Sequence, residues 1–585
     1  MKISRLKIQN YRNLKDVNID LNRVVVLIGD NNSGKSNLLR ALTLPFMNDE
    51  IGSISKNLGW DDINNTAKER YFSFVKDNAD YIINDKIELE KFEDFIPFVK
   101  VEVIFKPDED DVYYIKNWIN SLDGEEPIYS ISYKFYVENT KELFKHVQKI
   151  LEQEKDSIEN LKMNLLPIEF FKYSITIPST EEKVTYNDLA YFKYNSLAAE
   201  RDDFSNKNNR IGSKSLVNLL HNKLSNEDKV KIEKSYENFF NELKEISNID
   251  GIFNWQNHSE IENAKNFFDE ITLLPNMPSM RSLLNNVKLG YGDEALYKQG
   301  LGYRNLIYLL VMMNSLDISS DVALNILTIE EPEAHLSNSN ELMLASYINS
   351  LVNSSRQLQV FISTHSTIFV NKLKLENVCI VTEGNAFSLK SKLTKEQLDY
   401  LAKKPNLDFI KFLFSRKCIL VEGPTEEMLI RSYLSSQTNS LNDIEVISLH
   451  KGFTKVIDIW LKVNKNSSNR LGIIRDYDDQ PNAQREHEEY NKYKNIYVAT
   501  TKHYTLEPEI VFTGSNFEKL KTYFANYHGW TNIDTPESLS DKWRKAKADT
   551  MLKFCKDLVL DELAEIELPQ HIKKVLDFLQ SGEKN

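Results

Sequence analysis

Residues 29–36 have the types and spacing of a phosphate-binding loop. The segment reads Gly-Asp-Asn-Asn-Ser-Gly-Lys-Ser, follows the apolar run Val24–Ile28 and precedes a helical apolar pattern. In such a strand–loop–helix setting, backbone N–H groups surround phosphate oxygens and the helix dipole favours their charge. Lys35 is expected to reach the β- and γ-phosphates, and Ser36 to hold Mg²⁺. The predicted nucleotide-binding residues of this segment are Gly29, Asn32, Gly34, Lys35, Ser36 and Asn37.

A second apolar run, Ala323–Ile329, ends in the neighbouring carboxylates Glu330 and Glu331. Hydrolysis of a nucleoside triphosphate needs one acid for Mg²⁺ and one to polarise the attacking water. By position, Glu330 is expected near the metal and Glu331 as the catalytic base. A third run, Val360–Ser363, leads to His365, which could contact the γ-phosphate or serve only a structural role.

A glycine-bearing segment, with Gly300 and Gly302, lies just before the carboxylate strand and enters the apolar run Leu306–Met313. The order of phosphate loop, glycine-bearing segment, carboxylates and histidine resembles the ABC-type ATPases of the RecF/SMC group. In that group the segment of one subunit closes the ATP site of the other, so the resemblance implies a dimer with Gly300 and Gly302 at the nucleotide. The usual Ser-Gly-Gly is replaced here by Gly-Leu-Gly. The resemblance also places Arg12 near the nucleotide.

A separate set of carboxylates occupies the last third of the chain. Glu422 ends the apolar run Cys418–Val421, and Glu426 stands four residues later at an expected helix start. Asp476 and Asp478 follow a later apolar strand and would share one side of an extended segment. The carboxyl ends of strands are where open α/β sheets place their sites. Such oxygen ligands suit Mg²⁺ or Mn²⁺, and a metal pair there would promote phosphodiester cleavage.

Two further features follow these carboxylates. Glu507, within Thr505–Glu509, is a further candidate metal ligand. The segment 542–547, Lys-Trp-Arg-Lys-Ala-Lys, is interpreted as a basic helix start. It forms either a solvated face or a DNA-phosphate contact through Lys542, Arg544 and Lys545, with one lysine stabilising transition-state charge.

Composition limits the class of protein. The chain has 585 residues and a net charge of −13, which argues against a dedicated DNA-coating protein but permits a local basic groove. No run approaches the ~18 apolar residues of a membrane span, and Met1–Gln9 alternates like a strand and not like a signal peptide. Three widely spaced cysteines are interpreted as buried thiols. We therefore expect a cytoplasmic protein without a membrane partner.

The element pattern predicts an α/β protein with several domains. Strands are expected over 86–106, with Val99, Val101, Val103 and Phe105 on one face, and a helix over 141–163. Residues 1–204 and 273–400 are assigned to an ATPase domain and 412–585 to a second α/β domain. Residues 205–272 are predicted to be a helical insert, which either mediates dimerisation or packs on its own chain.

An ABC-type ATPase followed by one glutamate and an Asp-x-Asp after successive strands, the Toprim pattern, resembles the OLD (overcoming lysogenisation defect) family of nucleases. The family includes the nuclease subunit of Gabija anti-phage systems and retron-associated nucleases. The resemblance implies ATP-regulated, Mg²⁺- or Mn²⁺-dependent DNA cleavage, a dimerisation insert at about 205–272 and a role in phage defence. It implies DNA and a homodimer or larger homo-oligomer as partners, with either a helicase or a reverse transcriptase and its DNA beside them. It also indicates Lys547 as the active-site lysine, with Lys545 as the second choice.

Two other functions use similar parts. One is an ATP-driven DNA-repair-type clamp with a catalytically weak Toprim domain, which the full carboxylate set disfavours. The other is a Toprim domain used for strand passage or primer synthesis, for which no clearly placed tyrosine and no zinc motif are evident.

Overall fold

The computed structural model describes residues 1–47, 56–123, 126–154, 160–197, 211–247, 279–284, 287, 289–316, 322–404, 408–436, 443–477, 481–559 and 566–584. These residues divide into two compact units. The first contains Met1–Leu27, Gly34–Lys372 and Glu383–Asn385, and the second contains Ile28–Ser33, Leu373–Thr382 and Ala386–Asn585.

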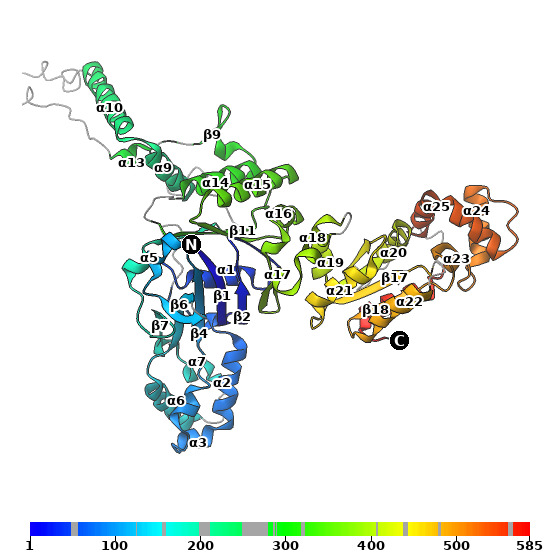
Figure 1. The fold of residues 1–585 in the computed structure, drawn as a ribbon, viewed down its shortest axis with the longest axis horizontal. Coiled ribbons are helices and arrows are strands. Elements are labelled where there is room, and N and C mark those ends of the chain that lie inside the picture. Colours follow the sequence, from blue (N-terminus) through cyan, green and yellow to red (C-terminus); the bar gives the residue numbers. More distant parts are fainter. Residues whose placement is uncertain are drawn as a thin grey trace, which may run out of the picture. The chain divides into compact units, whose positions relative to one another are not determined.

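The first unit contains an antiparallel sheet with the strand order β2-β1-β4-β6-β5, and β7 pairs with β6 (Figure 1). Its strands alternate in burial because one face covers the core. The predicted face at Val99, Val101, Val103 and Phe105 is buried. The strands are β1 (Lys2–Tyr11), β2 (Leu14–Asp20), β4 (Val99–Lys106), β5 (Ile119–Asp123), β6 (Glu126–Val137) and β7 (Phe171–Thr176).

The prediction of strands over the whole of 86–106 is wrong in its first half. Leu89–Glu93 forms the short helix α4, and only β4 is extended. Phe92 of α4 is fully buried, with its ring 5.1 Å from that of Phe144 on α6 (Thr140–Glu154). Packing against a neighbouring helix therefore decides the conformation of a segment whose local pattern is ambiguous.

A parallel sheet carries the phosphate loop, whose residues 29–33 group with the second unit and whose residues 34–36 group with the first. Its neighbouring strands β3 (Val24–Ile28), β12 (Leu358–Ser363), β11 (Leu324–Glu330) and β8 (Phe192–Leu197) pair in register in that order. The apolar runs that predicted β3, β11 and β12 are almost entirely buried, as expected for strands covered on both faces. Helix α1 (Lys35–Thr43) follows β3 directly through the loop.

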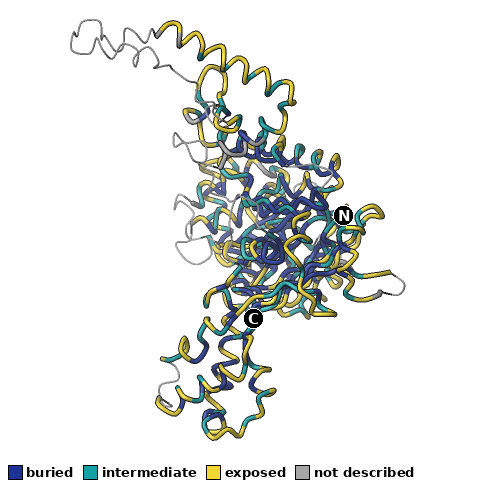
Figure 2. Tube along the Cα trace, turned by 90° about the vertical axis from the view of Figure 1, so that its left-hand side faces the viewer, coloured by how far each residue is buried: buried dark blue, intermediate teal, exposed yellow. Residues whose placement is uncertain are grey.

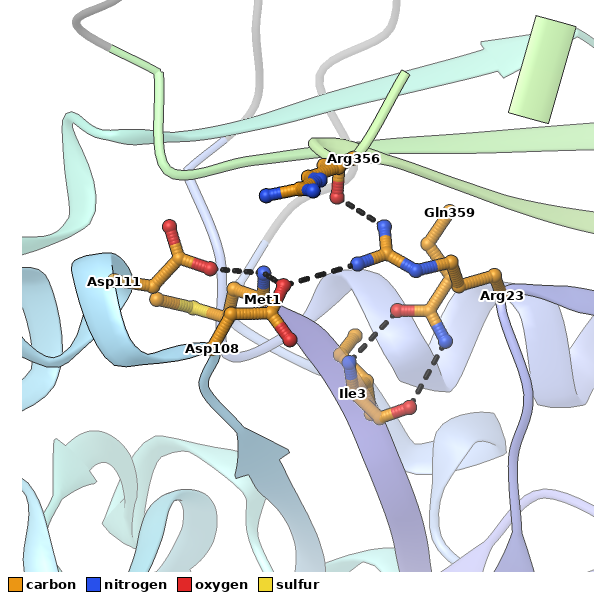
Figure 3. A network of polar contacts seen from close by, with 7 residues as sticks. All are labelled: Met1, Ile3, Arg23, Asp108, Asp111, Arg356 and Gln359. Carbon is orange, nitrogen blue, oxygen red and sulfur yellow. Dashed lines mark hydrogen bonds and ion pairs between the residues drawn. The ribbon is translucent and has the colours of Figure 1, made fainter. Parts of the chain in front are cut away.

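A polar network ties the two sheets of the first unit together (Figure 3). Gln359 of β12 accepts a hydrogen bond from the N–H of Ile3 at 2.8 Å and donates one to its carbonyl at 2.9 Å. The side-chain amide thus takes the place of a neighbouring strand beside the irregular register of β1. Arg23 pairs with Asp108 at 3.2 Å, and the amino group of Met1 contacts Asp108 and Asp111.

The described part of the predicted insert is helical. It consists of α9 (Ile211–Lys223) and α10 (Asn226–Ser247), while residues 205–210 and 248–272 lie outside the described residues. Helix α9 packs against α14 (Leu301–Ser315). Helix α10 is exposed along most of its length (Figure 2).

The second unit contains a four-stranded parallel sheet in the order β16-β15-β17-β18. These strands are β15 (Lys417–Val421), β16 (Ile444–Ser448), β17 (Arg470–Arg475) and β18 (Ile496–Thr500). Each connection contains a helix, which is the crossover that parallel strands require. The helices α20 (Pro424–Ser436), α25 (Pro536–Val559) and α26 (Gln570–Ser581) contribute to its apolar core.

The three cysteines are buried free thiols, as predicted. None of the helices within the described ranges is long and apolar enough to cross a membrane.

Candidate functional site

The phosphate loop has the backbone that its glycines predict. Gly34 caps α1 with φ 113°, and a Cβ atom there would lie 2.8 Å from the side-chain amide of Asn13. Asn32 also has a positive φ of 63°, a conformation that asparagine adopts more readily than most residues. Lys35 opens the helix and is 7% exposed. The loop can therefore direct N–H groups and a cation at a phosphate.

Ser36 and Glu330 are brought together by the parallel sheet. The Ser36 hydroxyl donates a hydrogen bond to Glu330 Oε2 at 2.5 Å. Ser36 stands at the start of α1 after β3, and Glu330 is the last residue of β11. A hydroxyl and a carboxylate at this distance are the two protein ligands that a Mg²⁺-nucleotide site of this type uses. The donor set therefore fits the metal and nucleotide that the sequence predicts.

Arg12 is held beside the same helix. Its Nε lies 2.8 Å from Asp62 Oδ1, and its Nη1 donates to Asn37 Oδ1 at 3.0 Å. Burial lowers the pKa of the Arg12 guanidinium, but the hydrogen bond to Asp62 and the nearby charges of Tyr11, Asp62 and Asp61 together outweigh burial, so the net shift is upward. Asn37 in turn donates to Asn13 at 2.8 Å. The structure thus joins Arg12 to Asn37, the residue after Ser36 on α1, in one polar cluster.

Glu331 and His365 follow the ends of two paired strands. The N–H of Glu331 donates to the Ser363 carbonyl at 2.8 Å, and Glu331 has a φ of 44°. The N–H of His365 donates to Glu333 Oε1 at 2.7 Å. The side chains of Glu331 and His365 are exposed. Both are therefore accessible to a ligand at this edge of the sheet.

The two glycines of the Gly-Leu-Gly segment play different parts. Gly300 caps α14, and a Cβ atom on it would meet nothing within 4 Å. At Gly302 a Cβ atom would lie 2.3 Å from the carbonyl oxygen of His335 in the same chain. Gly302 thus allows α14 to pack closely on the turn that follows the carboxylate strand. Leu301 and Tyr303 are 44% and 46% exposed at this helix start.

The second unit brings Glu422 and Asp476 together. Both follow the ends of paired parallel strands, β15 and β17, and the N–H of Asp476 donates to Glu422 Oε2 at 3.2 Å. Arg475 ends β17, is 6% exposed, and places its Nε 3.8 Å from Glu422 Oε2. Arg475 also contacts the ring of His487. The pKa of His487 is lowered mainly by burial and further by the positive charge of Arg475. The Glu422 carboxylate, bonded to the Asp476 N–H and beside a buried cation, therefore marks this sheet edge.

Glu426 lies in the first turn of α20, where the sequence predicts it, and is 4% exposed. It accepts hydrogen bonds from the N–H of Gly423 at 2.9 Å and from Thr425 at 3.1 Å. Burial raises the pKa of its carboxyl, and the nearby charge of Glu507 adds to that rise. Two buried, mutually repelling carboxylates favour a bound cation, so the residues fit a divalent metal.

The described residues do not bring three His, Cys, Asp or Glu side chains into one ready-made metal cluster. Asp478 lies outside the described residues. Of the metal ligands that the sequence predicts, Asp476 contacts Glu422 through its backbone N–H, and Glu507 lies near enough to Glu426 for its charge to act on it.

The basic segment is the middle of a helix and not its start, because α25 begins at Pro536. Trp543 is fully buried in the core, while Lys542 and Lys545 are exposed. Arg544 lies over the Tyr504 ring at 5.5 Å, and Lys542 over the Trp530 ring at 5.3 Å. Lys547 belongs to α25, but its side chain is outside the described set.

Comparison with known proteins adds the family to this geometry. Residues 1–370 match the family model of an AAA ATPase domain, and residues 413–478 match the overcoming lysogenization defect protein-like Toprim domain. The chain belongs to the OLD family. The sequence-based resemblance and the fold class, an ABC-type ATPase followed by a Toprim domain, are thereby confirmed.

One curated relative is similar over nearly the whole OLD-family chain. Endonuclease GajA of Bacillus cereus (strain HuB5-5) is 21% identical, and the match covers 98% of this chain and 95% of that protein. Among solved structures, the SMC head domain from Thermotoga maritima is 13% identical with a TM-score of 0.28, covering 66% of this chain and 98% of that one. The recombination mediator protein RecF gives 13% identity, a TM-score of 0.28 and the same coverage.

Sequence reasoning missed three residues of this OLD-family chain that hold the candidate site residues. Asp62 fixes Arg12, Glu333 fixes the backbone of His365, and Arg475 faces Glu422. Only Arg475 had a local signal, since a charged residue directly ends an apolar strand and precedes Asp476. The other two contacts join segments far apart in sequence, and no spacing rule reveals them.

Proposed function

We propose that this chain is a nucleotide-regulated DNA endonuclease. Its ATPase unit binds and hydrolyses ATP with Mg²⁺, and its Toprim unit cleaves phosphodiester bonds with Mg²⁺ or Mn²⁺. The observation that carries the proposal is the pairing of Glu422 with Asp476 at the ends of adjacent parallel strands. The similarity to GajA, an endonuclease, supports the same reaction.

In the ATPase unit, each candidate residue has a chemical task. Lys35 and the loop N–H groups neutralise phosphate charge, while Ser36 and Glu330 would hold Mg²⁺. Glu331 is exposed just after the carboxylate strand and is suited to accept a proton from water. His365 and Arg12 would contact the nucleotide from the neighbouring strand end and from the start of the chain.

In the Toprim unit, Glu422, Glu426, Asp476, Asp478 and Glu507 are the proposed metal ligands. When bound, Mg²⁺ or Mn²⁺ supplies positive charge at the attacking and leaving oxygens of a phosphodiester. Arg475 holds Glu422 in place from inside the protein. Lys547, with Lys545 as the second choice, is proposed to stabilise the negative charge that develops on the phosphate. Exposed Lys542 and Lys545, with Arg544, are proposed to contact DNA phosphates.

We further propose that the protein works as a homodimer or larger homo-oligomer. On α10, Phe239, Leu243 and Ile246 are 59%, 46% and 82% exposed, and their spacing puts them on one face. Exposed apolar side chains in one stripe favour burial against a second copy. The exposed Leu301 and Tyr303 at the Gly-Leu-Gly segment would then face the partner's nucleotide.

The biological setting proposed is anti-phage defence, with a helicase or a reverse transcriptase and its DNA as a further partner. This part rests on the family alone. The alternative is an ATP-driven DNA-repair-type clamp with a catalytically weak Toprim domain. The hydrogen bond from the Asp476 N–H to Glu422 and the nearness of Glu507 to Glu426 support the nuclease over this alternative.

The test of the proposed function is whether the two activities separate by mutation. Glu422→Gln removes a metal ligand with little change of shape, so it should abolish DNA cleavage while ATP hydrolysis continues. Lys35→Ala should abolish nucleotide binding and leave the metal ligands of the Toprim unit unchanged. Plasmid cleavage at the wild-type rate by Glu422→Gln would remove the Toprim carboxylates from the reaction.

A further inference from the structure

The first unit has a pocket that the proposed ATP site does not use. Its volume is about 760 Å³, and it opens beside β6, β7 and the segment that follows β7. Aromatic rings and ammonium groups make up much of its wall. They come from Lys56, Tyr136, Lys172, Tyr173, Lys183 and Tyr186.

The buried residue Tyr133 supports the aromatic wall of the pocket from the protein interior. Tyr133 is fully buried, its hydroxyl donates to the Lys56 carbonyl at 2.5 Å, and its ring stacks on that of Tyr173 at 5.7 Å and 18°. Tyr136 and Lys172 pair across β6 and β7. Tyr186 stands on the other side of the pocket and is 72% exposed. The Tyr173 ring, held by Tyr133, and the accessible Tyr186 ring can therefore receive a flat group.

The charge of the pocket is positive. Lys56, Lys172 and Lys183 face one carboxylate, Glu138, which pairs with Lys172. Lys56 is half-buried and donates to the Phe46 carbonyl. Burial lowers the pKa of the Lys56 ammonium to about 8. The ammonium therefore still carries its positive charge at neutral pH and can stabilise a bound anion.

We propose that this pocket binds a nucleoside phosphate, separately from the phosphate loop. The lysines would hold the phosphate and the tyrosines would stack on the base, which is how proteins bind nucleotides without reading their sequence. The volume holds one nucleotide unit. The same chemistry is offered by a free nucleotide and by the phosphorylated end of a DNA strand.

The pocket also reaches the phosphate-loop helix. Lys56 bonds to the carbonyl of Phe46, just beyond the end of α1, and α1 starts at Lys35. An occupant that draws the Lys56 ammonium toward its phosphate would loosen this bond. The pocket is thus placed to report its ligand to the ATPase site.

The experiment measures binding stoichiometry by equilibrium dialysis with three probes. These are labelled ATP, a short 5′-phosphorylated single-stranded oligonucleotide, and the same oligonucleotide without the phosphate. Lys35→Ala that also carries Lys542→Glu, Arg544→Glu and Lys545→Glu, which remove the proposed DNA contacts of the Toprim unit, should still bind one phosphorylated probe per chain. Adding Lys172→Glu and Lys183→Glu should weaken that binding at least roughly tenfold, as should Tyr186→Ala, which lies too exposed to disturb folding.

The matched control is Lys149→Glu on α6, an exposed lysine outside the pocket. It should bind like the parent protein. Retention of ATP identifies a free nucleotide as the ligand, and retention of the phosphorylated oligonucleotide alone identifies a strand end. In the otherwise wild-type chain, the pocket variant should lose one class of sites and keep the phosphate-loop class. Unchanged stoichiometry in that variant, or charge reversals no stronger than Lys149→Glu, would overturn the proposal.

Discussion

Ser36 Oγ lies 2.5 Å from Glu330 Oε2, although 294 residues separate them in sequence. The pair exists because β3 and β11 flank β12 in one parallel sheet, which brings their carboxyl ends to one edge. The relationship brings a hydroxyl after the phosphate loop and an acid after a strand together in one candidate Mg²⁺-nucleotide site. The first prediction follows from it.

Lys35→Ala should weaken ATP binding by roughly tenfold or more, because the phosphates lose their main counter-charge. Glu331→Gln should keep binding and slow hydrolysis by about 10²–10⁴-fold, the usual contribution of a general base. Fluorescent-nucleotide titration and single-turnover hydrolysis measure the two effects. Normal turnover in Glu331→Gln would assign the base to another residue.

Arg475→Met should reduce DNA cleavage about tenfold at saturating Mg²⁺ and leave ATP hydrolysis unchanged. The buried guanidinium orients Glu422, and methionine keeps the volume but not the charge. Arg485→Met, on α22 (Pro481–Glu488), provides a control for loss of a cation in the same unit. Equal cleavage by the Arg475 and Arg485 variants would show that Arg475 has only a packing role.

Phe239→Glu combined with Leu243→Glu should convert the oligomer to smaller species, because charge would enter the apolar stripe of α10. Asn241 lies on the opposite face of the same helix, so Asn241→Glu should leave the assembly intact. Light scattering over a range of concentrations distinguishes the outcomes. A wild-type protein that stays monomeric with and without ATP would contradict the dimer.

Stability should fall on acidification through His571. Burial lowers the pKa of this histidine from 6.5 to about 4, so the unfolded chain binds its proton at a higher pH than the folded chain. The stabilisation is complete above about pH 7 and is lost as the pH falls toward 4, by about 2 kcal/mol between pH 7 and pH 5. Urea unfolding of wild type and His571→Leu at both pH values measures the difference, and an equal loss in both proteins would exclude His571 as its source.

The sequence predicts those parts of the fold whose signals are local. The fully apolar runs Val24–Ile28 and Cys418–Val421 are strands because both faces of each are buried. The residues flanking such strands are therefore placed correctly at the sheet edges. In contrast, Leu89–Glu93 has too few residues to show a period, and its packing against α6 decides that it is a helix.

A helix start and two tertiary contacts differ in how far the sequence alone could predict them. The start of α25 was predicted wrongly at the basic segment 542–547, although Pro536 at the first helical position is a local signal, and Thr535 accepts from the N–H of Ser538. The contact of Arg475 with Glu422 could not be predicted from the sequence, because it requires the pairing of β15 with β17. The close packing of Gly302 on His335 likewise depends on how α14 meets a distant turn.

Coupling between the units is a further expectation. If ATP closes two ATPase units against each other, the attached Toprim units should move, and cleavage rates should differ between ATP, a non-hydrolysable analogue and no nucleotide. Rates that are indifferent to all three, in a protein shown to bind nucleotide, would leave two independent activities on one chain.

The central claim is that the Toprim carboxylates cleave DNA with a divalent metal. Its most direct measurement compares supercoiled-plasmid cleavage by the wild type and by Asp476→Asn, with Mg²⁺, with Mn²⁺ and with EDTA. Wild type should nick or linearise the plasmid with either metal and not with EDTA, and Asp476→Asn should leave it intact while still binding ATP. Cleavage that survives EDTA, or that Asp476→Asn retains at the wild-type rate, would contradict the account.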